Sequence, residues 1–101
     1  MSDLTLDILP QADADLEDIW LYTAQTWSTA QADHYIIALH KSFMLLCDMP
    51  TIAHERPEIT PPVRVYPSGQ HYVIYRVAGE TLTVLRVIHN RRNWQPLLEE
   101  T

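Results

Sequence analysis

The chain of 101 residues has the commonest size of a single domain, so we expect one domain over residues 1–101. Apolar residues make up 47% and charged residues 20% of the sequence, which excludes a disordered tail, a coiled coil and a collagen-like chain. A single cysteine, Cys47, excludes an internal disulfide. The apolar runs are about five residues long, too short to cross a membrane, and the N-terminus has acids where a signal peptide has basic residues. We therefore expect a cytoplasmic protein.

The negative charge lies in the first half of the chain. The net charge is −6, with eight acids against Lys41 in residues 1–50 and six arginines against five acids in residues 51–101. A negative chain disfavours non-specific binding of nucleic acid, because phosphates attract clustered cations. The second half can still present a local basic surface, or its arginines can lie along a sheet and pair with acidic helices.

The first elements in chain order are a short strand and a helix. Leu4, Leu6 and Ile8 alternate with polar residues, which predicts a strand. Pro10 ends this strand, and from Ala12 the apolar period becomes that of a helix whose first turns are acidic, as the helix dipole favours. The predicted buried stripe of this helix is Leu16, Ile19, Trp20, Thr23, Ala24 and Trp27.

A second helix is predicted directly after the first. Ser28 and Gln31 form a capping-box pattern that marks its start, and Pro50 marks its end. Because only a residue or two separates the two helices, we expect them to form an antiparallel hairpin. The predicted buried stripe of the second helix is Ala32, Tyr35, Ile36, Leu39, Phe43 and Leu46.

Three antiparallel strands are predicted in the second half of the chain. Residues 51–62 show no periodicity and are predicted to form an ordered loop. The predicted strands are residues 63–66, 71–77 and 81–89, with turns at 67–69 and 79–80. After Asn90 the pattern weakens to a short tail with the apolar anchors Trp94, Leu97 and Leu98. The order β-α-α-β-β-β, with a helix hairpin on one side of an antiparallel sheet, indicates an α+β fold.

The last two predicted strands carry apolar residues on both faces. A two-residue turn at Gly79-Glu80 would pair Val77 with Leu82, Tyr75 with Val84 and Val73 with Arg86, and would place Tyr72, Ile74, Leu85 and Val87 on the other face. A helix hairpin covers only one face of a sheet, so the second face needs another cover. We expect the C-terminal tail, a second copy of the chain or another protein to supply it.

Few residues follow a pattern typical of catalysis. The chain has no phosphate-binding glycine loop and no Gly-x-Ser-x-Gly motif, and its five histidines lack the spacing of zinc ligands, so we expect no cofactor and no metal. A set of cations with interleaved aromatic residues remains, a combination that grips phosphates and stacks bases. The set contains Arg64, Arg76, Arg86, His89, Arg91 and Arg92, with Tyr66, Tyr72, Tyr75 and Trp94.

The run Leu85-Arg86-Val87-Ile88-His89-Asn90-Arg91-Arg92-Asn93-Trp94 resembles the C-terminal signature of the ParE branch of the RelE/ParE toxin superfamily. Other pieces match in the family's order, namely Asp15-Leu16, Ile19, Tyr22, Ala32, Tyr35, Leu46, Pro50, Arg56, Arg64, His71 and Tyr75-Arg76. The resemblance covers residues 4–98 and implies the RelE/ParE-like α+β fold. The sequence departs from the family at Ala53, where glycine is common, and at Asn93, where aspartate is common.

The resemblance implies the toxin of a bacterial type II toxin–antitoxin pair, in a hetero-oligomer with a ParD-like antitoxin that wraps the toxin. It implies inhibition of DNA gyrase without catalysis and without direct nucleic-acid binding by the toxin alone. The RelE-like relatives are instead ribosome-dependent mRNA endonucleases. The net charge of −6 favours the gyrase inhibitor, as does His71-Tyr72 at a position where the nuclease branch often has a histidine–arginine pair. A third possibility is a degenerate toxin that acts only in a repressor complex.

Five residues are predicted to contact the target. Arg91, Arg92 and Trp94 form the end of the signature that we expect to be exposed, and Arg64 and His89 flank it. If the protein is a nuclease, Arg64 and His89 are the expected catalytic residues. The alternative for His89 is that it only orders the end of a strand through hydrogen bonds.

Overall fold

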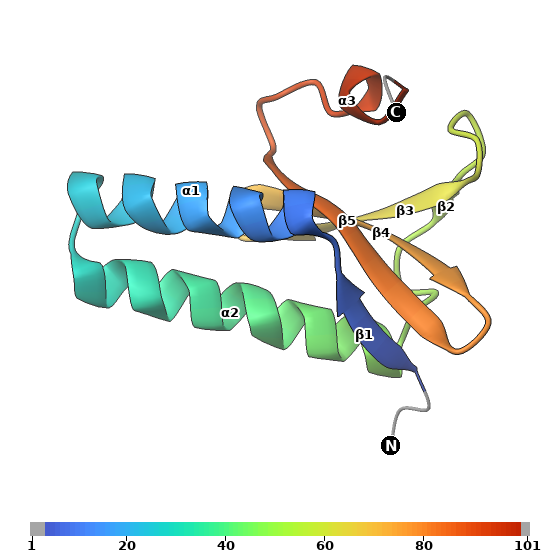
Figure 1. Ribbon diagram of the computed structural model, residues 1–101, viewed down its shortest axis with the longest axis horizontal. Coiled ribbons are helices and arrows are strands. Elements are labelled where there is room, and N and C mark those ends of the chain that lie inside the picture. Colours follow the sequence, from blue (N-terminus) through green and yellow to red (C-terminus); the bar gives the residue numbers. More distant parts are fainter. Residues whose placement is uncertain (1–3, 100–101) are drawn as a thin grey trace.

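The computed structural model describes residues 4–99, in which a helix hairpin packs on a five-stranded sheet (Figure 1). The elements are β1 (Thr5–Ile8), α1 (Pro10–Thr26), α2 (Thr29–Asp48), β2 (Glu55–Arg56), β3 (Val63–Ser68), β4 (His71–Ala78), β5 (Thr81–His89) and α3 (Gln95–Glu99). The strand order is β1-β5-β4-β3-β2, and β1 alone runs parallel to its neighbour. The predicted α+β order is confirmed. The two additions are the short strand β2, in the segment predicted as a loop, and the helix α3 in the tail.

The ends of the helix hairpin follow simple capping rules. Ser28 is the N-cap of α2, and its side-chain oxygen accepts a hydrogen bond from the backbone N–H of Gln31 at 3.0 Å. α1 begins at Pro10 rather than Ala12, because the fixed φ of proline suits the first turn of a helix. Trp27 and Ser28 alone separate the helices, which lie side by side as predicted (Figure 1).

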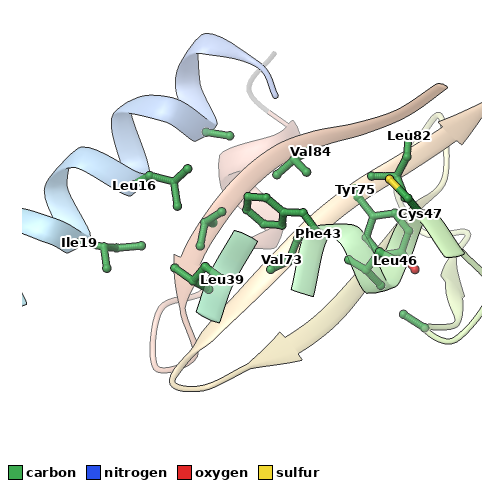
Figure 2. Packing of buried hydrophobic residues seen from close by; sticks show 13 residues of the cluster. Leu16, Ile19, Leu39, Phe43, Leu46, Cys47, Val73, Tyr75, Leu82 and Val84 are labelled. Carbon is green, nitrogen blue, oxygen red and sulfur yellow. The ribbon is translucent and has the colours of Figure 1, made fainter. Parts of the chain in front are cut away.

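The main core fills the space between the helix hairpin and the sheet (Figure 2). Figure 2 shows Leu16 and Ile19 of α1 on one side of this core and Phe43 of α2 near its centre. Tyr75 of β4 is completely buried, and its hydroxyl donates to the carbonyl oxygen of Pro50 at 2.8 Å, which ties the sheet to the end of α2. Trp27 is not part of the core: it is 76% exposed, because the tip of the hairpin projects beyond the sheet (Figure 1).

The chain itself covers the second face of the sheet. Ile59, Val63, Ile74, Ile88 and Trp94 form a second buried cluster, against which Val65, Tyr72, Leu85, Leu97 and Leu98 pack. Among the covers expected for this face, the structure therefore shows the C-terminal tail, helped by Ile59 from the segment between β2 and β3. The prediction that Trp94 is exposed is wrong, because its side chain is a main part of this cover and the residue is 8% exposed.

A β-bulge changes the predicted register of β4 and β5. The predicted pair of Tyr75 with Val84 is present, but Val73 pairs with Val87 instead of Arg86. The cause is one extra residue in β5, Leu85, because the pairing shifts between Ile74 and Tyr75. Val87 therefore joins the main core rather than the second face.

A largely buried ion pair joins α1 to the edge of β5. β1 ends at Ile8, which pairs with Val84, so the rest of β5 has no strand on that side. The Asp15 carboxylate takes this place and accepts hydrogen bonds from Arg86 Nε at 2.8 Å, Arg86 Nη2 at 3.0 Å and the Val87 backbone N–H at 2.9 Å. The side chains of Arg86 and Asp15 are 17% and 14% exposed. Hydrogen bonding to Asp15 raises the pKa of Arg86, so the guanidinium is charged at neutral pH.

We expect Asp15→Asn to lower the free energy of unfolding by about 3 kcal/mol, because it leaves the Arg86 charge largely buried without a counter-charge. Chemical denaturation measures this loss. Asp18→Asn is the matched control, since Asp18 is an exposed acid of the same helix, and we expect it to change stability by less than about 0.5 kcal/mol. Equal losses in the two variants would contradict the role of the ion pair.

We expect Trp94→Ala to cost about 3 kcal/mol and to make the protein bind a hydrophobic dye, because it uncovers the second face of the sheet. Trp27→Ala removes an equally large but exposed side chain and serves as the control. Thermal unfolding and dye fluorescence of both variants test this. The covering role of Trp94 is wrong if the two variants behave alike.

Candidate functional site

A groove of about 780 Å³ lies between the helix hairpin and one end of the sheet. Its walls come from α1, from Tyr35 of α2, from the turn between β3 and β4, and from the end of β5 with Arg91 and Arg92 after it. Two exposed aromatic residues of α1 and its C-cap also line it, Tyr22 at 61% and Trp27 at 76% exposure. The groove therefore combines aromatic, polar and cationic side chains.

Two histidines meet at the end of the sheet inside this groove. His71 and His89 are partners in the pairing of β4 with β5, and their rings form an edge-to-face pair with centroids 5.3 Å apart. The Tyr35 hydroxyl lies 2.6 Å from His71 Nδ1 and accepts the backbone N–H of Gln70 at 3.0 Å. We assign the hydroxyl as the donor to Nδ1, so the ring proton of His71 is on Nε2.

Burial determines the protonation states of His71 and Tyr35. It lowers the pKa of His71 from 6.5 to about 4, with a second contribution from His89, while the Asp15 charge acts in the opposite direction. Burial also raises the pKa of the Tyr35 hydroxyl, against the hydrogen bond from Gln70. At neutral pH the structure therefore holds a neutral imidazole next to a neutral phenol.

Gly69 allows Tyr35 to approach the sheet. Its φ of +60° lies in the left-handed region, and a Cβ at this position would lie 2.8 Å from the Tyr35 hydroxyl oxygen. The turn predicted at residues 67–69 instead occupies Gly69 and Gln70, because β3 continues to Ser68. The Ser68 hydroxyl, 2.6 Å from that of Ser42 in α2, holds the end of this strand.

The structure brings three of the predicted site residues together. The Arg91 backbone N–H donates to His89 Nδ1 at 3.1 Å, and the Arg92 backbone N–H donates to the His89 carbonyl oxygen at 2.9 Å. Both arginine side chains are exposed and line the groove. His89 thus orders the turn that presents the two guanidinium groups, as in the alternative considered for this residue.

Arg64 lies at the other end of the sheet. It pairs with Tyr75, which is four residues along β4 from His71, a separation of about 13 Å along the strand. Its guanidinium donates to the Ala53 carbonyl oxygen at 2.6 Å and to Glu55 at 3.4 Å. The structure therefore does not bring together Arg64 and His89, the pair expected for a nuclease.

Three residues of the site were not singled out as functional by the sequence patterns. Tyr35 falls on a helical core stripe, His71 starts a strand, and Asp15 stands among the acids of a helix start. Each occurs in the segments that carry the family resemblance, which is the one signal that includes them. Their contacts join residues that are far apart in the chain. Asp15 and Arg86, for example, are separated by 71 positions.

Within residues 4–99, no group of three or more metal-ligating side chains could hold a metal ion. The helices described by the structure include none that is long and apolar enough to span a membrane.

Comparison with known proteins assigns the family. The family model described as the ParE toxin of the type II toxin–antitoxin system parDE matches residues 6–94, which include every residue that lines the groove. The chain belongs to this ParE toxin family. Toxin ParE1 of Mycobacterium tuberculosis is 39% identical over 83 residues, which are 81% of this chain and 85% of that protein.

Other relatives agree with this assignment. Toxin ParE1 of Caulobacter vibrioides is 34% identical over 83 residues, 82% of this chain and 85% of that protein, and Toxin ParE of Escherichia coli is 32% identical over 82 residues, 80% of each. A solved structure of the chromosomal ParDE TA system from P. aeruginosa has a TM-score of 0.74, with 20% identity, 85% coverage of this chain and 95% of that one. That likeness confirms the ParE fold.

We expect the His71 ring to stay neutral until the pH approaches its lowered pKa of about 4. The unfolded chain binds this proton near pH 6.5, so the free energy of unfolding falls as the pH drops from 6.5 towards 4. NMR titration of the imidazoles, with denaturation at pH 7 and pH 5, measures both effects. His71→Gln should flatten part of this pH dependence, whereas His54→Gln, at an exposed histidine, should not. An ordinary titration of His71 near pH 6.5 would contradict its burial.

Proposed function

We propose that this ParE-family toxin inhibits DNA gyrase, and thereby DNA replication, and that a ParD-like antitoxin neutralises it in a hetero-oligomer. The family match over residues 6–94 is the observation that carries the proposal. The separation of Arg64 from His89 supports a protein inhibitor rather than a nuclease built on that pair. Because gyrase acts on bacterial chromosomal DNA, the proposal also places the toxin in the cytoplasm.

Arg91 and Arg92 are the proposed contacts with the target. Both are exposed, and within the described part of the chain neither guanidinium has an ion-pair or hydrogen-bond partner. His89 orders the start of this turn, and Trp94 anchors its other end in the second core, so both act by positioning it. Contact of Arg64 with the target stays a prediction, since its guanidinium is already hydrogen-bonded.

The outer side of the helix hairpin is the proposed antitoxin surface. Ile37 and Met44 of α2 are 54% and 58% exposed and lie two helical turns apart on one face. Trp20 of α1 donates from Nε1 to Asp33 at 2.8 Å, which joins the two helices on this side. Exposed apolar residues on one side of a monomer favour a protein partner there.

We expect purified toxin to inhibit gyrase supercoiling, and the Arg91→Ala/Arg92→Ala double variant to need at least about tenfold more protein for the same inhibition. The matched control is Lys41→Glu at an exposed cation of α2, which lowers the net charge by the same two units as the double variant. Circular dichroism checks that both variants fold. Full potency of the first variant would exclude the proposed contacts.

If the wild-type protein does not inhibit gyrase supercoiling, gyrase is not the target. Cleavage of mRNA on ribosomes would then indicate the nuclease function. Absence of growth arrest on expression would indicate a degenerate toxin.

A further inference from the structure

The groove contains hydrogen-bond donors that face no acceptor in the described part of the chain. His89 Nδ1 accepts the Arg91 backbone N–H, so the proton of the neutral ring is on Nε2. Tyr35 sets the same tautomer in His71. Within residues 4–99 neither Nε2 has a hydrogen-bond partner, and the guanidinium groups of Arg91 and Arg92 have none either. Within residues 4–99, every buried side-chain nitrogen or oxygen has a hydrogen-bond partner. The two Nε2 atoms have no such partner, so they are not buried and are accessible to water or to a ligand.

The charges around these donors suit a doubly negative oxyanion. Asp15 is already neutralised by Arg86, which leaves the exposed Asp18 as the other acid that lines the groove. Arg91 and Arg92 supply two positive charges, and guanidinium groups bind phosphate oxygens through two parallel N–H bonds. A phosphate monoester carries about −1.5 to −2 charges at neutral pH, so it matches this pair.

The rest of the groove suits a flat aromatic group. Tyr22 presents an exposed ring, and exposed aromatic rings stack on bases with little sequence preference. Thr23 and Gln31 add polar groups to the same wall. The volume of about 780 Å³ lies within the usual range of small-molecule sites, which is about 300–1,000 Å³.

We propose that the groove binds a nucleoside monophosphate, with its phosphate held by Arg91, Arg92 and the two histidines and its base stacked on Tyr22. The net charge of −6 and the acids of α1 repel a longer polyanion, which favours one nucleotide over a nucleic-acid strand. A triphosphate carries more negative charge than the two guanidinium groups balance. The site uses the two guanidinium groups that are also the proposed target contacts, but nucleotide binding is measured on the isolated chain without gyrase, so the two proposals fail separately.

Titration of the full chain with AMP, inorganic phosphate and adenosine tests the proposal, with the imidazole and backbone NMR signals of His71, His89 and Arg91 as the readout. We expect AMP to saturate with a Kd of about 0.1–1 mM, a weak site on the affinity scale, and phosphate and adenosine each to bind at least about tenfold more weakly. The shifts should be largest at these three residues. Absence of saturation by AMP, or equal affinity for AMP and phosphate, would overturn the nucleotide site.

Two pairs of variants separate the roles of charge and ring. Arg91→Gln/Arg92→Gln should weaken AMP binding at least about tenfold, whereas Lys41→Glu, with the same change in net charge at an exposed residue of α2, should not. Tyr22→Ala should weaken AMP but not phosphate, and Tyr22→Phe should keep the affinity because the ring remains. AMP binding that survives in both the double arginine variant and Tyr22→Ala would place the ligand elsewhere and overturn the proposal.

Discussion

The carboxylate of Asp15 satisfies a constraint that the rest of the fold depends on. β5 is longer than its parallel neighbour β1, so beyond Val84 its edge would bury a backbone N–H and a guanidinium without acceptors. Unpaired polar groups of this kind cost more than a hydrogen bond gains. Because Asp15 accepts hydrogen bonds from both groups, α1 is fixed against the outer part of β5, and Asp15 itself lines the groove.

The bulge at Leu85 acts in the same region and determines which residues meet. In the regular register set by the Gly79-Glu80 turn, His71 would pair with Ile88. The extra residue in β5 moves His89 opposite His71 instead, and it turns Val87 into the main core while Ile88 enters the second one. One inserted residue therefore places Val87 and Ile88 in their two cores and also brings His89 opposite His71.

Sequence patterns predicted those parts of the fold that are determined by residues close together in the chain. The capping pattern at Ser28, the stop at Pro50 and the Gly79-Glu80 turn gave the helix hairpin and the last two strands correctly. The bulge, the pairing of Asp15 with Arg86 and the contact of Tyr35 with His71 depend instead on residues brought together only by folding. Trp94 was misplaced for the same reason, since an aromatic residue after the last strand can either cover a sheet or face a partner.

The exposed arginines illustrate how the buried parts of the molecule prepare its surface. The turn that carries Arg91 and Arg92 is held at one end by two hydrogen bonds to His89 and at the other by the buried indole of Trp94. His89 in turn packs against His71, which Tyr35 and Gly69 hold in place. A turn fixed at both ends loses little further backbone freedom when it binds, so more of the contact energy of its guanidinium groups remains for a partner or ligand. In a chain of net charge −6, a short basic turn held in this way favours one specific contact over a general attraction for anions.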